Sequence, residues 1–386
     1  MQYRSFGKLN WKPSALGFGT MRLPILDGDP ARIDEPLATK MIRTAIDAGV
    51  NYIDTACVYH RGQSEPVVGR ALRNGYRARV KLATKLSHIL KSESEFDEYL
   101  DKQLETLQVD RIDFYLLHGL NRRSWQLEEA SLPWLERAVS DGRIGHIGFS
   151  FHDDLATFKQ IVDAHDWSFC QIMYNYMDID DQAGTEGLHY AAERGLAVVV
   201  MEPLRGGGLV EPLPDRVHQL LKRAPIARTP AEWALHWVWD HPEVSCVLSG
   251  MSTFEQVEQN LAAAAASGME QMTEAELDVI AGVRAEYRSL VRVRCTKCQY
   301  CMPCPNGVNI LHIFRLYNDL AMYGNEEWIR TQYFDHTPEP MRAPACLECG
   351  ACEAACPQQI PIIKALREAH AALLTTLPET CPPEEE

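Results

Sequence analysis

Short apolar runs alternate with amphipathic segments from residue 40 to about residue 265. Seven runs in this region and one earlier run are rich in Val, Ile, Leu and aromatic residues, which is typical of strands covered on both faces. These runs are residues 14–20, 51–56, 80–86, 112–119, 144–150, 169–175, 196–204 and 244–250. The pattern therefore predicts eight strands.

The segments between these runs follow the period of a helix. In residues 94–108 four apolar side chains form one stripe opposite the charged residues. They are Phe96, Leu100, Leu104 and Leu107. Residues 153–165 are also amphipathic, and residues 229–242 begin with Thr followed by Pro, a favourable helix start.

Eight strands alternating with helices over roughly 250 residues predict an α/β fold, a (β/α)8 TIM barrel of parallel strands. An open doubly wound sheet is the alternative, but no Gly-x-Gly-x-x-Gly follows an early strand. We expect the barrel over residues 1–270 and a connecting helix over residues 271–293. A cysteine-rich helical domain should follow over residues 294–375, and the acidic, Pro-rich tail 376–386 should be disordered.

The formal net charge of −15 argues against nucleic acid and against an anionic membrane surface as partners. No run approaches the roughly 20 apolar residues of a membrane span, and residues 1–10 lack the apolar core of a secretory signal. We therefore expect a cytoplasmic protein. In that reducing compartment clustered thiols indicate metal binding rather than disulfides.

Two short stretches near the end hold eight of the twelve cysteines. The second stretch has three cysteines spaced by two residues and a fourth spaced by three before Pro357, which is the bacterial iron–sulfur pattern. The first stretch is one residue shorter before its last cysteine. A tetrahedral zinc site would need only two closely spaced pairs, so a third cysteine in each stretch would be surplus.

In a two-cluster arrangement the fourth cysteine of each stretch serves the other cluster. We therefore predict two 4Fe–4S clusters in an α-helical, ferredoxin-like domain. The ligands predicted for one cluster are Cys295, Cys298, Cys301 and Cys356, and those for the other are Cys346, Cys349, Cys352 and Cys304.

Four polar residues stand at or just after the carboxyl ends of consecutive predicted strands, where reactive groups of such barrels lie. They are Asp54, Tyr59, Lys85 and His118. An ammonium beside a tyrosine eases proton donation, a carboxylate keeps that ammonium charged, and a histidine can orient a carbonyl oxygen. Taken singly, each has a structural alternative. Asp54 could cap the loop, Tyr59 could pack on the surface, Lys85 could be a solvated strand end, and His118 could be a buried core imidazole.

The sequences NYIDTACVYHRGQSE, LATKL, FYLLHG and GRIGHIGFS resemble those of the aldo-keto reductases over about residues 1–265. The whole chain resembles the subgroup with a carboxyl-terminal ferredoxin-like domain. The resemblance implies NAD(P)H-dependent reduction of a small aldehyde or ketone. Tyr59 would be the proton donor, Asp54 and Lys85 would tune it, and His118 would orient the substrate.

By the same resemblance the nicotinamide lies across the barrel mouth. Its ribose and carboxamide would be held by Thr20, Asp54, Ser150 and Gln171. The backbone of residues 203–208, including Leu204 and Gly206, would approach the pyrophosphate, because glycines permit close contact.

Three departures from the family pattern concern the cofactor. Phe151 replaces a frequent Asn, and Met201 replaces a Tyr that stacks on the nicotinamide. In the adenosine-ribose loop, residues 249–260, Gly250 and Gln256 replace the usual Lys and Arg. Those cations normally pair with the 2'-phosphate, so NADP preference is in doubt, and the alternatives are NADH or a loss of nicotinamide binding.

A hydride carries two electrons and an iron–sulfur cluster carries one, so efficient exchange between them needs a flavin. An FMN site in a barrel need leave no sequence fingerprint, so the sequence does not exclude a bound flavin. Three readings follow: a carbonyl reductase with structural or sensing clusters, an oxidoreductase that exchanges single electrons with a ferredoxin or flavoprotein, and an interaction module with the barrel as scaffold.

Overall fold

The computed structural model describes residues 1–87, 92–295 and 298–374, so the predicted tail 376–386 lies outside the described residues. The chain forms two compact units. The first contains residues 1–206 and 228–273, and the second contains residues 207–227 together with the chain from residue 274 onward. The segment 207–227, expected within the barrel domain, therefore clusters with the second unit.

The first unit is built on a closed barrel of parallel strands, in which each strand pairs with the next and β8 pairs with β1. The strands are β1 (Leu16–Gly19), β2 (Tyr52–Asp54), β3 (Lys81–Leu86), β4 (Ile112–Leu120), β5 (Ile144–Phe151), β6 (Phe169–Met173), β7 (Ala197–Met201) and β8 (Val244–Gly250). All eight lie within or beside the apolar runs of the sequence. The predicted (β/α)8 barrel is confirmed.

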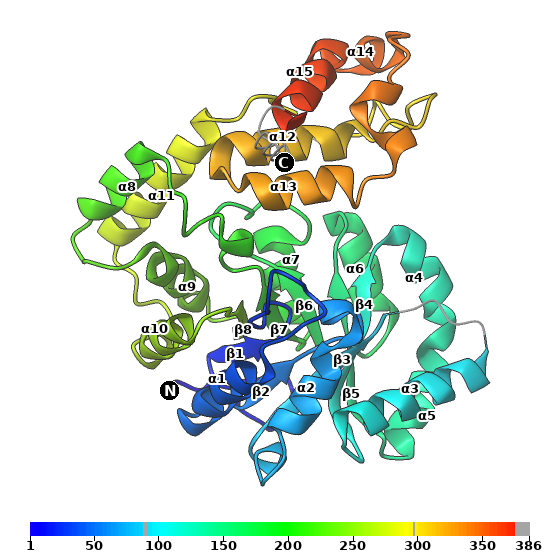
Figure 1. Cartoon of the computed structure of the whole chain (residues 1–386), viewed down its shortest axis with the longest axis vertical. Helices are drawn as coiled ribbons and strands as arrows, with labels where there is room; N and C mark the ends of the chain where they lie inside the picture. Colours follow the sequence, from blue (N-terminus) through cyan, green and yellow to red (C-terminus); the bar gives the residue numbers. More distant parts are fainter. Residues whose placement is uncertain (88–91, 296–297, 375–386) are drawn as a thin grey trace, which may run out of the picture. The chain divides into compact units, whose positions relative to one another are not determined.

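Helices surround the strands of this unit (Figure 1). They are α1 (Glu35–Asp47), α2 (Ser64–Ala71), α3 (Glu93–Leu107), α4 (Arg122–Glu128), α5 (Leu132–Ser140), α6 (Leu155–Ala164), α7 (Gly184–Glu193), α9 (Pro230–Asp240) and α10 (Phe254–Ala265). Short 3-10 turns are η1 (Tyr59–Gly62), η2 (Arg77–Arg79), η3 (Glu129–Ser131) and η4 (Arg205–Gly207). Helix α9 begins with a capping box, in which Thr229 and Glu232 satisfy each other's backbone N–H groups.

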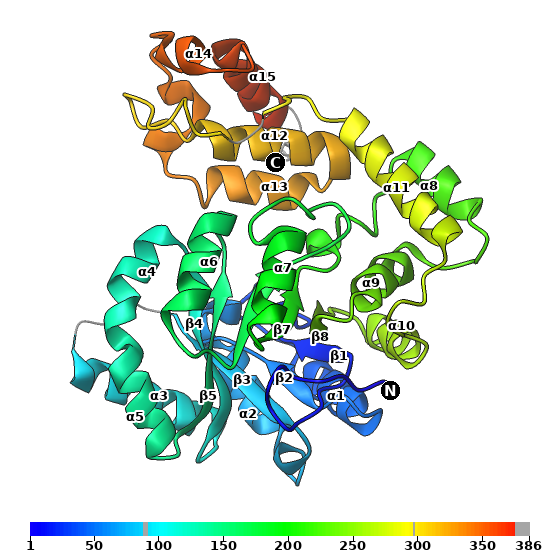
Figure 2. The ribbon, with the colours of Figure 1, turned by 180° about the vertical axis from the view of Figure 1, so that it is seen from behind.

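An aromatic cluster fills the amino-terminal end of the barrel. Phe6 is fully buried and packs with Tyr52, Phe114 and Phe169, which project from the first halves of β2, β4 and β6. The amino-terminal segment thus crosses this end of the barrel (Figure 2). Because this end is filled, the opposite end, at the carboxyl ends of the strands, is left for chemistry.

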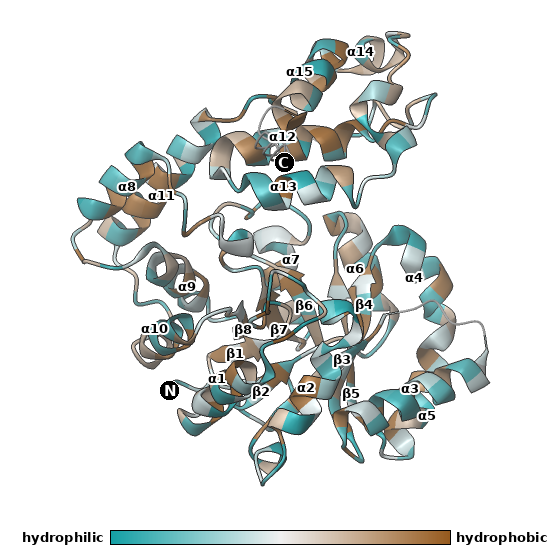
Figure 3. Cartoon of the chain, viewed as in Figure 1, coloured by the Kyte–Doolittle hydropathy of each residue, from teal (hydrophilic) through white to brown (hydrophobic). Residues whose placement is uncertain are grey.

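The second unit is helical. Its helices are α8 (Asp215–Lys222), α11 (Glu274–Ser289), α12 (Ile310–Tyr323), α13 (Glu326–Phe334), α14 (Ala351–Ala355) and α15 (Ile362–Leu374), with 3-10 turns η5 (Glu339–Met341) and η6 (Ala343–Ala345). The helix expected to connect the domains is α11, which packs against α8. Both helices carry hydrophobic as well as hydrophilic residues (Figure 3), and Val217 and Leu221 of α8 and Ile280 and Val283 of α11 are buried.

The core of the second unit lies between α12, α13 and α15. Ile313, Phe314, Ile329, Leu366 and Leu373 are among its buried residues. Five of the eight clustered cysteines pack against this core and Cys352 belongs to it. Within the described ranges, no helix is both long and apolar enough to cross a membrane.

Candidate functional site

A buried ion pair lies at the carboxyl ends of β2 and β3. Lys85 Nζ donates to Asp54 Oδ1 at 2.6 Å and to the carbonyl oxygen of Thr55 at 2.9 Å. The two charged side chains are 1% and 3% exposed, respectively. Because a buried charge without its partner is costly, each residue holds the other in its charged form.

Tyr59 and His118 complete the predicted group of four. Tyr59 begins η1, the first turn in the loop after β2, and the Lys85 ammonium lies 4.8 Å from the centre of its ring. The ring centres of Tyr59 and His118 are 6.0 Å apart, with the rings nearly perpendicular. Both are half-buried, whereas Asp54 and Lys85 are buried. The four side chains therefore meet, and the phenol and imidazole are the two that remain partly open.

The environment keeps the phenol protonated and the lysine charged. Burial raises the pKa of Tyr59, although the Lys85 ammonium acts in the opposite direction. Burial would lower the pKa of Lys85, but Asp54 and Tyr59 outweigh it and the pKa is raised. Burial also raises the pKa of Asp54, against the pull of Lys85. At neutral pH the group therefore holds a neutral phenol beside a cation.

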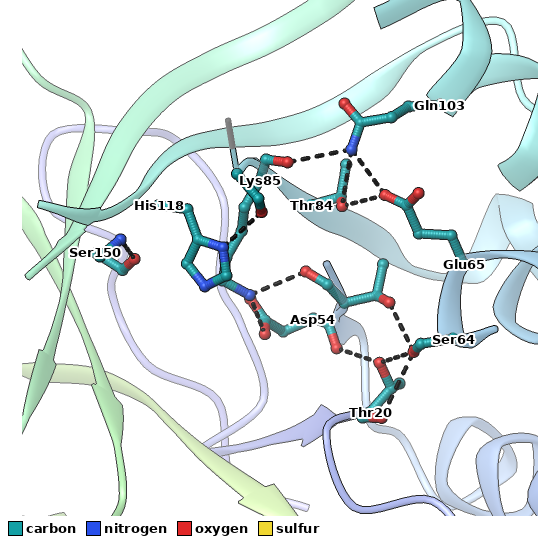
Figure 4. Close-up of polar contacts among 12 residues, drawn as sticks. Thr20, Asp54, Ser64, Glu65, Thr84, Lys85, Gln103, His118 and Ser150 are labelled. Atoms are coloured by element: carbon teal, nitrogen blue, oxygen red, sulfur yellow. Dashed lines mark hydrogen bonds and ion pairs between the residues drawn. The ribbon is translucent and has the colours of Figure 1, made fainter. Parts of the chain in front are cut away.

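A second layer of polar residues holds β3 in place behind Lys85 (Figure 4). Glu65 accepts hydrogen bonds from Thr84 Oγ1 at 2.6 Å and from Gln103 Nε2 at 2.7 Å. Gln103 also donates to the carbonyl oxygen of Lys85 at 3.1 Å and accepts from Tyr115 at 2.6 Å. The sequence interpretation missed this network, which fixes the backbone from which Lys85 projects.

Ser87 is a further residue that the sequence interpretation missed. Its hydroxyl lies 2.5 Å from His118 Nδ1. In an extended chain, residues two apart share a face, and Ser87 comes two residues after Lys85, directly after the end of β3. That alternation was the signal that could have found it.

Thr20, predicted to hold the cofactor, is fully buried and bonded within the protein. Its hydroxyl donates to the Asp54 carbonyl oxygen at 3.0 Å and lies 2.8 Å from Ser64 Oγ, which in turn lies 2.9 Å from Thr55 Oγ1. These bonds tie the end of β1 to the end of β2. The structure therefore places Thr20 as a support of the Asp54 backbone.

Ser150 and Gln171 are neighbours in register on β5 and β6, and both are buried. Ser150 Oγ accepts from the Gly119 N–H at 2.7 Å, which leaves its own hydroxyl proton free to donate (Figure 4). Gln171 Oε1 is a buried acceptor with no partner among the described residues. A free donor and an orphaned acceptor side by side match a carboxamide.

The two loops expected to carry the rest of the dinucleotide follow β7 and β8. Leu204 and Gly206 are half-buried, and Gly206 has a φ of 67°. Gly250 ends β8 and is exposed, as is Gln256 in α10, whose side-chain oxygen accepts from the Ser252 N–H at 2.8 Å. Phe151 is fully buried and packs on Phe158, so it faces away from the mouth.

In the second unit, four cysteines line one cavity. They are Cys295, Cys298, Cys301 and Cys356. Apolar side chains from α12 and from the chain around α15, among them Phe314 and Ile362, complete its wall. Burial, followed by the neighbouring Cys295 thiol, raises the pKa of Cys301. The sulfurs that the crossed pattern assigns to one cluster are thus brought together from both stretches.

The other four cysteines also come from both stretches. Cys352 is buried, Cys304 and Cys346 are half-buried, and Cys349 is exposed. Asn306, two residues after Cys304, donates to the carbonyl oxygen of Ala345 at 2.6 Å, which ties the first stretch to the start of the second. The Glu348 N–H donates to Cys346 Sγ at 3.4 Å. No three described His, Cys, Asp or Glu side chains converge on a point that could hold a single metal ion.

Comparison with known families agrees with this division of the chain. Residues 15–280 match the model described as "Aldo/keto reductase family". Residues 294–360 match the model described as "4Fe-4S dicluster domain". The first match covers more than half of the chain.

Relatives over the barrel are oxidoreductases. L-galactose dehydrogenase from Arabidopsis thaliana is 27% identical over 304 residues, covering 72% of this chain and 94% of the relative. The uncharacterized oxidoreductase YrpG from Bacillus subtilis is 25% identical over 310 residues, covering 68% and 91%. The solved holo form of aldo-keto reductase AKR11C1 from Bacillus halodurans superposes with a TM-score of 0.62 at 27% identity, covering 73% of this chain and 96% of that one. The chain therefore belongs to the aldo/keto reductase family and is an oxidoreductase with a 4Fe–4S dicluster domain C-terminal to its barrel.

Proposed function

We propose that the barrel reduces a small aldehyde or ketone with NAD(P)H and that Tyr59 donates the proton to the carbonyl oxygen. The observation that carries the proposal is the buried Asp54–Lys85 ion pair directly beside the half-buried phenol. A phenol held next to a fixed cation gives up its proton more readily once negative charge develops on a nearby oxygen. The resulting phenolate is stabilised by the same ammonium.

The imidazole of His118 would orient the substrate. When Ser87 donates to His118 Nδ1, the imidazole keeps its proton on Nε2 and can donate it to the same carbonyl oxygen. Two donors, the phenol and the imidazole, then define where that oxygen sits. Asp54 pairs with Lys85, and Lys85 lies beside the phenol, so both residues would act by positioning and charge rather than by contact with the substrate.

The residues at the mouth fit a nicotinamide. Its carboxamide can donate to the orphaned Gln171 Oε1 and accept from the Ser150 hydroxyl. When bound, the reduced nicotinamide supplies the hydride. The buried position of Gln171 gives this contact its specificity, because a buried acceptor without a partner costs free energy that a matching donor recovers.

Replacing Gln171 by Leu tests this contact. We expect the dissociation constant of the preferred nicotinamide nucleotide to rise by roughly threefold to tenfold, the effect of one lost hydrogen bond. The melting temperature should not fall, because the change removes a buried acceptor that has no partner among the described residues. Calorimetric titration and thermal unfolding measure the two effects. An unaltered affinity would place the carboxamide elsewhere.

The proposed reaction has a direct test with the unmodified protein. Anaerobically purified protein should oxidise NADH or NADPH, followed at 340 nm, only when a small aldehyde or ketone is present. A panel of short aliphatic and aromatic carbonyl compounds covers the proposed substrate class. If none of them supports oxidation of either nucleotide, the proposed reductase activity is wrong.

The pH dependence follows from the raised pKa of Tyr59. Carbonyl reduction needs the protonated phenol, so kcat should be flat through neutral pH and should fall only above the ordinary tyrosine pKa of about 10. Oxidation of the alcohol needs the deprotonated phenol, so its kcat should rise with pH over the same range. A fall in the reduction rate between pH 6 and 8 would indicate histidine as the donor instead.

For the second unit we propose two 4Fe–4S clusters. Cys295, Cys298, Cys301 and Cys356 would hold one, and Cys346, Cys349, Cys352 and Cys304 the other. The cavity lined by the first four thiols supports this set, because its wall is otherwise largely apolar and offers a cluster a low-dielectric site. Such clusters supply one-electron transfer. A chain with these thiols is expected in the reducing cytoplasm.

The match to a 4Fe–4S dicluster domain supports a second candidate function, exchange of single electrons with a ferredoxin or flavoprotein partner. In that case the barrel would bind the terminal substrate or serve as a scaffold, and a flavin would convert between one-electron and two-electron steps. Dithionite-reduced protein should then regain its absorbance near 400 nm when substrate is added. If reduced clusters stay reduced with every carbonyl substrate that the enzyme turns over, the clusters do not feed the barrel reaction.

A further inference from the structure

The loop after β1 places a cation where the dinucleotide loops lack one. Arg22 lies three residues beyond Gly19, which pairs in register with Gly250 at the end of β8. A Cβ built at Gly250 would lie 3.3 Å from Cβ, Cγ and Cδ of Arg22. The aliphatic part of Arg22 therefore occupies the space directly over Gly250.

The guanidinium end of the same side chain reaches the loop after β7. A Cβ built at Gly206 would lie 3.1 Å from Arg22 Nη2. Arg22 thus extends from the loop expected to hold the adenosine ribose to the loop expected to approach the pyrophosphate. The Ser252 hydroxyl donates to the Arg22 carbonyl oxygen at 3.0 Å, which fixes the backbone of this bridge.

The charge of Arg22 is not neutralised within the barrel unit. The residue is exposed, and within the described ranges no carboxylate pairs with its guanidinium. Arg205, the other arginine at this end, differs, because both carboxylate oxygens of Asp178 accept from it. Of these two arginines, Arg22 is therefore the one that can bind an anion from solution.

We propose that Arg22 is a phosphate-binding residue of the nicotinamide dinucleotide and supplies the cation that position 250 lacks. This inference rests on the proposed NAD(P)H-dependent function. An arginine binds phosphate through a planar fork of N–H donors, which a glycine backbone does not hinder. Gly250 takes part indirectly, since any side chain there would compete with the Arg22 stem for the same space.

Two phosphates of the cofactor have the required chemistry. If Arg22 contacts the pyrophosphate, it binds NADH and NADPH alike. If it contacts the 2'-phosphate, it binds NADPH alone and restores the preference that Gly250 and Gln256 would otherwise abolish. Both nucleotides therefore serve as probes in the test.

The test is calorimetric titration of the anaerobic full-length protein with NADH and NADPH, which does not depend on turnover. We expect Arg22→Gln to raise the dissociation constant by roughly tenfold or more, as the loss of a charge-assisted hydrogen bond should. Arg22→Lys should recover part of the affinity, because charge remains but the fork is lost. Arg123→Gln is the matched control, since Arg123 is also exposed but lies on α4.

The outcomes separate this inference from the proposed function. A loss for both nucleotides supports contact with the pyrophosphate, and a loss for NADPH alone supports contact with the 2'-phosphate. If the unmodified protein binds a nucleotide and Arg22→Gln binds it equally well, the Arg22 inference is wrong while the proposed function stands. If the unmodified protein binds neither, the proposed function fails and the inference fails with it.

Discussion

Tyr59→Phe is expected to lower kcat for carbonyl reduction by roughly 100-fold to 10,000-fold, the range typical of losing a general acid. The change removes one hydroxyl and leaves the ring that packs against His118 and lies beside Lys85. Nucleotide binding should therefore change little. The measurements are kcat and KM under anaerobic conditions, together with the dissociation constant of the nucleotide.

This substitution is a sharper test than a change at Asp54 or Lys85. Removing one member of that buried pair would leave an uncompensated charge and cost about 3–5 kcal/mol of stability, so lost activity could reflect misfolding. The matched control is Tyr76→Phe, because Tyr76 also loses a hydroxyl, bonded to Asp47 at 3.2 Å, in the stretch that leads into the start of β3. Full activity in Tyr59→Phe would assign the proton donor to another group.

The strands were predictable because a strand of a parallel barrel is buried on both faces and leaves a continuous apolar run. The site was predictable to the extent that it sits at strand ends. Asp54 is the last residue of β2 and Lys85 the next-to-last residue of β3, and parallel pairing of these two strands brings such residues together without further information. The 4Fe–4S dicluster domain over residues 294–360 was predictable for another reason, since the spacing of cluster-binding cysteines is dictated by the size of the cluster rather than by the fold.

The supporting residues were harder to predict because their role depends on tertiary contacts. Gln103 lies three residues after Leu100 and four before Leu107, on the apolar stripe of α3, and it is only 2% exposed. A polar residue at such a position is ordinarily taken to face solvent. Here its amide is fully used by Glu65, Tyr115 and the Lys85 backbone, partners that no local pattern in the sequence reveals.

Arg22 illustrates the same limit in a loop. The absence of a cation at Gly250 is visible in the sequence, but the proposed replacement is a residue 228 positions earlier whose side chain lies over Gly250 and reaches Gly206. Only the pairing of β1 with β8 brings the two together. A family motif that lacks one residue can therefore keep the chemistry of that residue, provided that a neighbouring strand supplies it.

The largest expected effect in the second unit comes from removing cysteines in pairs. Cys301→Ala with Cys356→Ala should leave one intact 4Fe–4S cluster, with about four iron atoms per chain instead of about eight. The reason is that both thiols line the same cavity, so two ligands of one cluster are lost and the other cluster keeps all four. Iron and sulfide analysis after anaerobic reconstitution, with the EPR signal of the dithionite-reduced protein, measures the result.

The matched control also removes two thiols, but both come from the first cysteine stretch. Cys301→Ala with Cys304→Ala takes one ligand from each cluster under the crossed assignment, so both clusters should be impaired and the intact-cluster signal should be lost. If each stretch instead held its own cluster, the two double variants would exchange results, because Cys301 and Cys304 would then serve one cluster. Under either assignment, only one of the two double variants keeps a complete set of four thiolates. The comparison thus decides between the two ligand assignments even where both variants lose iron.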